Sequence, residues 1–430
     1  MSLFIKKLFK GDTVVWILFT ILIVLSIVEC FSAIGTLAYA RSNMFQPIIR
    51  HAGLLLLGYA IVIALHHVPY RLTGLLTPVA MIISILFLIL ALFNGVELND
   101  AKRWLEIFGI QFQPSEIAKV SLVMYIAWTL GKAHQSPDGK EKAFWKVLIA
   151  TGIICLLIVT QNMSTAVMIA FFAYLMLWIG GAPLKHMLWL TGIVASVGLI
   201  LLLLLVNVPD IPGVSRWSEW HSRLVSDDEV DVLDDAYRLT DENMQEHYAK
   251  IAISQGKFLG VLPGNSTQRD FLPQAYSDFI YAIIIEDLGW LGLLGVPLIY
   301  IMLLFRCRKI AKSCTRMVPA LLVMGCGLIV SMQAFVNMAV AVGFFPVTGQ
   351  ALPLVSRGGT SGVITCLYFA LILSVSRFGA SETEEEVWEA EDAEVAEVEA
   401  EQLAAAAQKM AEAEAAQQAL STEDYASMAE

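Results

Sequence analysis

The stretch DFIYAIIIEDLGWLGLLGVPLIYIMLLF, residues 278–305, combines a long apolar run with three carboxylates. A membrane helix needs about 20 mostly apolar residues, and this run exceeds that length. Glu286 and Asp287 interrupt it, although a charge at membrane depth is costly. We therefore expect either one long span over 279–305 or a short re-entrant helix followed by the true span.

Apolar runs of similar length recur along most of the chain. Of the 430 residues, 57% are hydrophobic and only 16% are charged, whereas a soluble domain has about 25% charged residues. Ten candidate spans lie at roughly 13–34, 50–66, 72–93, 115–131, 144–160, 164–181, 186–208, 279–305, 317–343 and 360–376. The sequence therefore predicts an all-α polytopic membrane protein with about ten transmembrane helices and a large extracytoplasmic loop between spans 7 and 8.

The orientation of these spans follows from the basic residues of the short loops. They cluster before the first span and after the fourth and eighth, at Lys6, Lys7, Lys10, Lys132, Lys140, Lys142, Arg306, Arg308, Lys309, Lys312 and Arg316. In a ten-span chain these segments share one side, which the positive-inside rule makes cytoplasmic. Both termini are then cytoplasmic, and the loops 94–114, 209–278 and 344–359 are outside. A helix-like stretch at 241–255 indicates that the large outer loop is partly ordered.

The charge distribution divides the chain into three parts. We assign residues 1–12 to a cytoplasmic N-terminus, 13–377 to the membrane domain and 378–430 to a cytoplasmic tail rich in Glu and Ala. Residues 381–430 carry a charge of −15 within a total of −11, which leaves +4 on the rest. The tail composition predicts disorder or a solvated single helix, with partner binding as the alternative.

Several function classes lack their motifs. There is no Walker loop, no GxGxxG after a strand, no HExxH and no nucleic-acid motif, which disfavours an ATP-driven pump, a zinc protease and a nucleic-acid partner. Four of the six cysteines lie inside apolar runs. Cys307 and Cys314 lie in a basic loop without a nearby His or third Cys, so we read all six as structural or incidental thiols.

The first notable outward-facing stretch is AKRWLEIFGIQFQPSEIAK, residues 101–119. Lys119 follows Glu116 by three positions, which places both on one helix face. A lysine inside a span indicates a functional site with Glu116 as its partner, and a structural ion pair is the alternative. Arg103 and Trp104 suit either an interfacial anchor or a contact to an anion.

The second stretch is GVLPGNSTQRDFLPQAYSDFIYAIIIEDLG, residues 260–289. Its turn region offers hydrogen-bond donors at Ser266, Gln268 and Arg269. Asp278 could cap the following helix by accepting a backbone N–H. From the pattern alone, a cap and a functional acid are equally supported.

The two further carboxylates of this stretch have a different interpretation. Glu286 lies eight residues after Asp278, about 12 Å along a helix, so the two do not form an acid/base pair. We assign Glu286 and Asp287 to helix breaking or packing.

The third stretch is GFFPVTGQALPLVSRGGTSG, residues 343–362, and it is dense in Gly and Pro. Broken backbone at membrane depth is tolerated only where protein or water covers it. Arg357 beside Gly358 and Gly359 could present a cation and N–H groups to an anion, and a plain re-entrant turn is the alternative. Together the three stretches indicate a polar, partly cationic outer cavity, suited to a transporter of an anionic lipid or to an enzyme acting on one.

The same three stretches occur in this order in the SEDS family (shape, elongation, division and sporulation). FQPSEIAK at 112–119 resembles its QPSE or QPAE…K motif. GNSTQRDFLPQAYSDFIYAIIIEDLG at 264–289 resembles its GxS…LPEAHTDFIFAxxxEELG signature, and PVTGQALPLVSRGGTS at 346–361 resembles PxTGxxLPxxSYGGSS. The likeness runs from about residue 13 to 377.

This resemblance implies a peptidoglycan glycosyltransferase of the bacterial cytoplasmic membrane. It would polymerise lipid II, the undecaprenyl-pyrophosphate-linked disaccharide-pentapeptide, at the outer face. Its expected partners are a class B penicillin-binding protein, which crosslinks the product, and other divisome or elongasome membrane proteins. A divalent cation (Mg or Mn) is plausible, although the sequence shows no ligand cluster for one and we assign no metal ligand.

The resemblance also assigns roles to residues. The family aspartate of LPEAHTDF matches Asp278, which would act as the base that takes a proton from the acceptor hydroxyl. The family lysine after QPSE matches Lys119. We assign Asp278 as catalytic and the following residues as substrate-binding: Lys119, Glu116, Arg103, Trp104, Arg269, Ser266, Gln268 and Arg357.

The chain departs from the family pattern near the site. Gln274 and Tyr276 replace the Glu and His of LPEAHTDF, Arg269 replaces a Lys, and Arg357 replaces the Tyr of SYGG. Asn162 stands where the QPDLGT motif has its Asp. The charge balance of the cavity therefore differs from the commoner pattern.

Two other functions remain open at this level. A lipid II flippase would use Lys119 and Glu116 along a translocation path and would make no polymer. A non-catalytic division scaffold would depend on the acidic tail more than on Asp278. The SRGGTS variant and the tail favour the division members of the family over its elongation members.

Overall fold

The computed structural model describes residues 9–33, 46–98, 101–107, 110–133, 139–208, 221, 241–272, 275–345 and 347–378. The predictions for the N-terminal lysines Lys6 and Lys7, for Gln274 and for the tail lie outside these residues. The description below concerns the membrane unit, which ends before residue 380.

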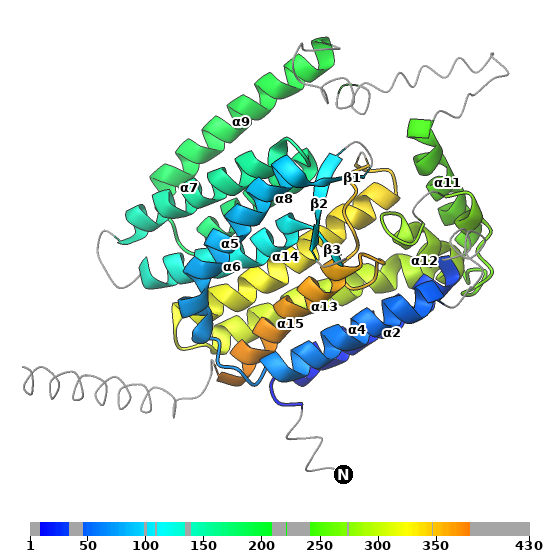
Figure 1. Ribbon diagram of the computed structural model, residues 1–430, viewed down its shortest axis with the longest axis horizontal. Coiled ribbons are helices and arrows are strands. Elements are labelled where there is room, and N and C mark those ends of the chain that lie inside the picture. The colour runs from blue at the N-terminus through cyan, green and yellow to red at the C-terminus, as the bar shows by residue number, and fades with distance from the viewer. Residues whose placement is uncertain are drawn as a thin grey trace, which may run out of the picture. The chain divides into compact units, whose positions relative to one another are not determined.

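All ten predicted spans coincide with helices (Figure 1). Their bounds are α2 Thr13–Ala33, α4 Gln46–Leu65, α5 Leu72–Asn94, α6 Pro114–Ala133, α7 Gly139–Val159, α8 Met163–Ile179, α9 Leu184–Asn207, the pair α12 Ile280–Leu288 and α13 Trp290–Ser313, α14 Met317–Ala341 and α15 Thr360–Phe378. Within the described residues, eight helices are long and apolar enough to cross a membrane. Of the others, α6 carries three charged residues and α8 is shorter. The polytopic all-α fold is confirmed.

The run at 278–305 breaks into two helices. The nine-residue α12 is followed by α13, so the alternative of a short helix before the true span is confirmed. The break lies at Gly289, which has φ +59°, and a Cβ there would come within 2.6 Å of the Phe258 carbonyl oxygen. Only glycine adopts this conformation without strain at so close an approach.

Helix α14 forms the centre of the bundle and packs on α6, α13 and α15. Small residues let these helices approach closely, as is usual in membranes. A Cβ on Gly327 would lie 2.6 Å from the Cys307 sulfur of α13, and one on Gly325 would lie 3.0 Å from Val123 of α6. The most apolar window of α14 is 67% buried, whereas that of α9 is 6% buried. Helix α9 therefore leaves nearly its whole surface to lipid.

Two of the loops that were predicted to lie outside contain regular structure, and one of the elements was not predicted. A three-stranded antiparallel sheet, β1 Val96–Leu98, β2 Ala101–Ile107 and β3 Ile110–Phe112, follows α5. Strand β3 is tied to α15, because the Thr360 hydroxyl donates to the Gln111 carbonyl at 3.0 Å. The predicted helix at 241–255 is present as α11, Asp241–Gly256.

The two ends of the membrane unit meet. Asp12 caps α2, and its carboxylate pairs with Arg306 of α13 at 2.6 Å. Its backbone N–H donates to Ser376 of α15 at 2.9 Å. The start of α2 and the end of α15 thus lie at one end of the bundle, as an even number of crossings requires.

Candidate active site

The loop 350–357, between α14 and α15, is held in place by side chains of three helices. Asn337 donates to the Gln350 carbonyl at 2.7 Å, and Tyr300 of α13 donates to the Pro353 carbonyl at 2.6 Å. Ser26 of α2 donates to the Val355 carbonyl at 2.9 Å. Side chains from three helices therefore satisfy its broken backbone, as is needed at membrane depth.

Asp278 lies beside this loop, two residues before α12. The side chain of Asn337 donates to the Asp278 carbonyl at 2.8 Å as well as to Gln350. Ser356 donates to the Ser277 carbonyl at 2.6 Å. The Asp278 side chain is half-buried, and its Oδ1 accepts from the Ser277 hydroxyl at 2.9 Å. The backbone is thus fixed on both sides, while the carboxylate stays partly accessible.

Lys119 lies in the second turn of α6 and is 1% exposed. Its ammonium contacts Glu116 at 2.7 Å and donates to the Gln333 side chain of α14 at 2.6 Å. Gln333 donates in turn to the Ala351 carbonyl at 3.1 Å. Gln333 and Asn337 are one turn apart on α14, about 6 Å along its axis. The structure therefore connects Lys119 and Asp278 through adjacent turns of α14 and the loop 350–357.

Arg357 lies against the segment that carries Asp278. Its backbone N–H donates to the Tyr276 carbonyl at 2.9 Å, and its guanidinium lies 5.3 Å from the centre of the Tyr276 ring. Both residues depart from the family pattern, and they contact each other. The two residues that differ from the family signatures therefore form one contact in the structure.

The two predicted residues of the outer loop, Arg103 and Trp104, lie in β2. Trp104 is half-buried and pairs with Val96 of β1. The Arg103 side chain lies outside the described part of the structure.

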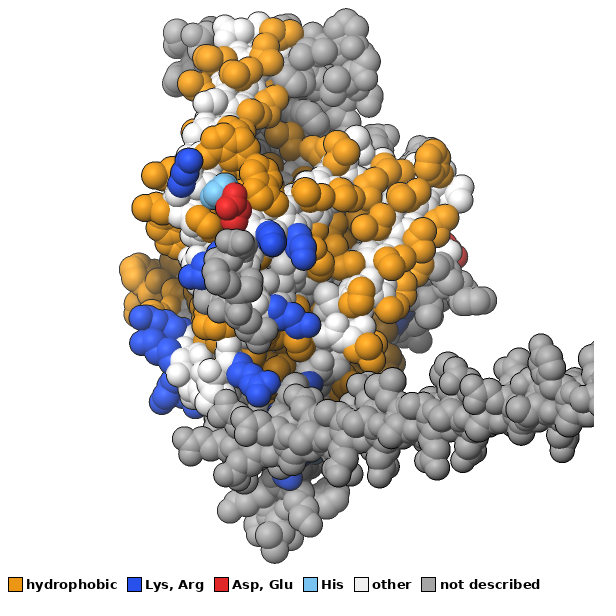
Figure 2. All heavy atoms as spheres, turned by 90° about the vertical axis from the view of Figure 1, so that its left-hand side faces the viewer, with side chains coloured by type: hydrophobic (Ala, Val, Ile, Leu, Met, Phe, Trp, Pro, Cys, Tyr) orange, Lys and Arg blue, Asp and Glu red, His pale blue; other side chains and the backbone are white. Residues whose placement is uncertain are grey.

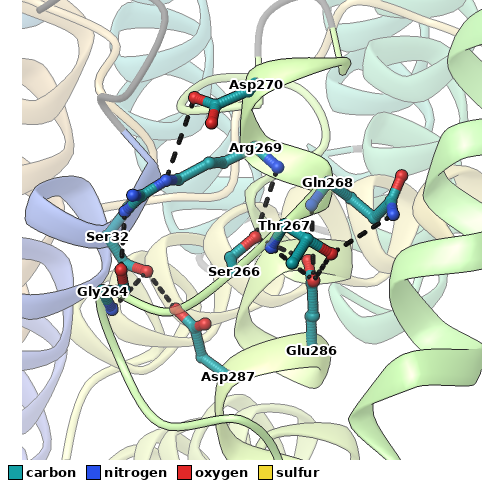
Figure 3. Close-up of polar contacts among 9 residues, drawn as sticks. All are labelled: Ser32, Gly264, Ser266, Thr267, Gln268, Arg269, Asp270, Glu286 and Asp287. Carbon is teal, nitrogen blue, oxygen red and sulfur yellow. Dashed lines mark hydrogen bonds and ion pairs between the residues drawn. The ribbon is translucent and has the colours of Figure 1, made fainter.

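Ser266, Gln268 and Arg269 make their contacts at the other end of α12, as Figure 3 shows. The Glu286 carboxylate accepts from the Ser266 hydroxyl at 2.6 Å and from the backbone N–H groups of Thr267 and Gln268 at 2.8 and 3.3 Å. Arg269 donates to the carbonyls of Ser32 and Gly264, at 3.1 and 2.9 Å. These contacts hold the turn 264–270 onto α12 and α2.

Asp287 completes this second cluster. It accepts a hydrogen bond from Ser32 of α2, whose hydroxyl accepts from the Gly264 N–H at 2.8 Å. Glu29, one turn earlier on α2, is fully buried and interacts electrostatically with Asp287. The contacts of Asp287 with Ser32 and of Glu286 with Ser266 hold the turn 264–270 against α2 and α12.

Sequence reasoning missed Gln333 and Asn337. The available signal was their spacing, because two amides four residues apart in an apolar span share one helix face. It also missed Glu29, which is fully buried near Asp287, a residue far away in the sequence.

No three His, Cys, Asp or Glu side chains gather into a potential metal site within the described residues. A divalent cation therefore stays a prediction from the resemblance.

Comparisons with known proteins place this geometry in context. The family model for cell-cycle proteins of the FtsW, RodA and SpoVE type matches residues 12–381. The chain is 33% identical over 357 residues to the probable peptidoglycan glycosyltransferase FtsW of Nitrosococcus halophilus, covering 79% of this chain and 86% of that protein. It is 30% identical over 366 residues to the protein of the same name from Halorhodospira halophila, covering 84% and 88%.

Two solved structures share the fold. A mutant of the rod shape determining protein RodA of Thermus thermophilus aligns with a TM-score of 0.61 at 24% identity, over 86% of this chain and 99% of that one. A chain from a peptidoglycan synthase complex that coordinates polymerization and crosslinking aligns with a TM-score of 0.65 at 24% identity, over 86% and 98%.

Proposed function

The chain belongs to the FtsW, RodA and SpoVE family of cell-cycle proteins, and from this membership we propose that it is a peptidoglycan glycosyltransferase whose substrate is lipid II. The division role follows from its relatives, which carry the name FtsW. The observation that carries the mechanism is the half-buried Asp278, whose carbonyl is held by Asn337 while Ser356 holds the carbonyl of the preceding Ser277.

Asp278 is the general base in this proposal. Glycan polymerisation requires a sugar hydroxyl to attack an anomeric carbon while a lipid pyrophosphate departs. The base takes the hydroxyl proton as the new bond forms, which suits a positioned carboxylate. The hydrogen bond from Asn337 to the Asp278 carbonyl fixes the backbone that carries the carboxylate.

The departing pyrophosphate needs positive charge nearby. Lys119 is paired with Glu116, so the pair is neutral as a whole and acts through the direction of its dipole rather than through net charge. Arg357 is the cation next to the Asp278 segment, and its half-exposed side chain can meet an anion. We assign leaving-group stabilisation to Arg357 and to Lys119.

The membrane placement follows from the distribution of exposed cations. The cytoplasmic end carries Lys132, Lys140, Lys142, Lys146, Arg308, Lys309, Lys312 and Arg316, all exposed. Figure 2 views this end, where Lys and Arg side chains gather and Asp and Glu are rare. The positive-inside rule then puts both ends of the membrane unit in the cytoplasm and Asp278 outside.

A class B penicillin-binding protein is the partner that we propose. The proposal draws on the peptidoglycan synthase complex that shares the fold and that coordinates polymerization with crosslinking. A divalent cation, Mg or Mn, could neutralise the pyrophosphate, and no step above depends on it.

The experiment is polymerisation of labelled lipid II by the purified full chain with and without the partner synthase. We expect glycan strands from the wild type and none from Asp278→Asn. The matched control is Asp270→Asn, which removes a carboxylate from the same outer segment and should keep the rate. A chain that moves lipid II across vesicle membranes but makes no polymer would instead be a flippase.

A further inference from the structure

An outward-facing pocket lies where four helices end together. It lies between the C-terminal ends of α5 and α7 and the N-terminal ends of α6 and α8. Its wall is mostly apolar, including Leu88 and Ala91 of α5, and its polar members are Gln113, Ser115, Gln161 and Asn162. An apolar wall with a few convergent polar groups is the lining that small-ligand sites use.

Two polar atoms of this wall are buried without a partner among the described residues. They are Oγ of Ser115 and Nδ2 of Asn162, on residues only 5% and 6% exposed. The orientation of Asn162 is determined, because its Oδ1 caps α8 by accepting the Thr165 N–H at 3.0 Å. The amide N–H groups must then point away from that cap. Buried donors without a partner are rare in native proteins, so a ligand group is expected to meet them.

The chemistry of the wall selects the class of ligand. None of the lining residues is charged, so the wall lacks the cations that bind a phosphate in other proteins. A neutral donor, a neutral hydroxyl and an apolar surface match an acetamido group. The amide of Asn162 would donate to its carbonyl oxygen, the hydroxyl of Ser115 would accept from its N–H, and its methyl would contact Ala91. The N-terminal ends of α6 and α8 also favour the negative end of a carbonyl dipole.

A short series of hydrogen bonds joins the pocket to the candidate active site. Thr165, in the first turn of α8, accepts from the Gln350 side chain at 2.5 Å. The Gln350 carbonyl is held by Asn337, which also holds Asp278. On the other side, Ser115 directly precedes Glu116, the partner of Lys119. These contacts link the wall of the pocket to the residues that hold Asp278 and Lys119.

We propose that the pocket formed by Ala91, Ser115 and Asn162 is a specificity subsite for the acetamido group of a lipid-linked amino sugar. The inference rests on the proposed function, because it names the part of the substrate that this subsite reads. A site that hydrogen-bonds a substrate amide discriminates strongly against an analogue that lacks it, since its own polar groups are then left unpaired.

The test compares two substrates on the purified full chain with its partner synthase. One is lipid II, and the other is a synthetic lipid II in which hydroxyl groups replace the acetamido groups. The measured quantity is the ratio of the two kcat/KM values. We expect the wild type to prefer the natural substrate by about 100-fold or more, and we expect Ser115→Ala and Ala91→Leu each to lower this preference by about tenfold. The matched control is Ser121→Ala, which removes another buried hydroxyl of α6, bonded to Ser84 at 2.7 Å, and should keep the wild-type ratio.

The outcomes are separable. Equal use of both substrates by the wild type, or an unchanged ratio in Ser115→Ala and Ala91→Leu, overturns the subsite. A wild type that makes no polymer from lipid II overturns the proposed function instead. A folded variant that polymerises neither substrate is scored by equilibrium binding of the two lipids, where the same loss of preference is expected and an unchanged preference again overturns the subsite.

Discussion

The two ends of α12 carry carboxylates in opposite situations. Glu286 and Asp287, at its end, are fully buried. Glu286 alone accepts hydrogen bonds from the side chain or backbone of Ser266, Thr267 and Gln268. Asp278, before its start, is half-buried, and Asn337 holds its backbone carbonyl. A fully buried carboxylate that accepts several hydrogen bonds from one turn holds structure, whereas a partly exposed carboxylate can meet a substrate.

The donors of the turn 264–270 belong to the Glu286 end of α12. The Ser266 hydroxyl and the Gln268 backbone N–H donate to Glu286, and Arg269 donates to the carbonyls of Ser32 and Gly264. Their contact with substrate stays a prediction. The donors that surround Asp278 come from α14 instead. Proximity along the sequence is therefore a poor guide to which polar groups meet in a bundle.

The largest expected effect is on the polymerisation rate, and it comes from a substitution of Asp278, before the start of α12. Asp278→Asn keeps the size and the backbone contacts but removes the base, so polymerisation should fall about 100-fold or more. The thermal midpoint in detergent should stay within a few degrees of wild type. A near wild-type rate of lipid II polymerisation would contradict the assignment.

The next effect concerns the buried ion pair beside the site. Lys119→Met leaves Glu116 buried with no cation, which should cost about 3–5 kcal/mol of unfolding free energy. The double variant Lys119→Met with Glu116→Gln restores a neutral site and should recover most of the stability without recovering the rate. If the double variant is as unstable as the single one, an unpaired Glu116 charge is not the cause of the lost stability. Denaturation in detergent measures the free energy of unfolding of both variants, and lipid II polymerisation measures their rates.

At the other end of α12 the effect should fall on stability rather than on rate. Glu286→Gln removes a charged acceptor of several hydrogen bonds, which should cost about 1.5–3 kcal/mol. The rate per folded molecule should stay within a few-fold of wild type, so the variant is the counterpart of Asp278→Asn. Loss of polymerisation in a fully folded Glu286→Gln would erase the distinction between the two ends.

The smallest expected effect tests the contact between Arg357 and Tyr276. Arg357→Lys keeps the charge but weakens the stacking on Tyr276, which is worth about 0.5–1 kcal/mol. We expect a KM for lipid II raised only a few-fold, and the same change in Tyr276→Leu. Additive effects in the double variant would show that the two residues act independently.

Much of the fold could be predicted because each membrane helix is recognised from its own run of apolar residues. Each apolar run from 13–34 to 360–376 became a helix, and the interruption at 286–289 correctly indicated a break. The sheet at 96–112 was missed because its three short strands have little apolar pattern and depend on contacts with α5 and α15. Pattern alone also could not choose between a cap and a functional acid for Asp278, since both need a carboxylate at a helix start.

By itself, then, the sequence determined the membrane class, the number of spans and the presence of a lysine, an aspartate and a broken loop on one face. These features are local, because hydrophobic length and helical period act over about 20 residues or fewer. The tertiary structure alone decided that Gln333 and Asn337 link Lys119 to Asp278, that Arg357 stacks on Tyr276, and that Glu286 is fully buried while Asp278 is half-buried. Those outcomes depend on which side chains from distant helices meet in a medium that cannot satisfy a polar group, and no local pattern encodes that meeting.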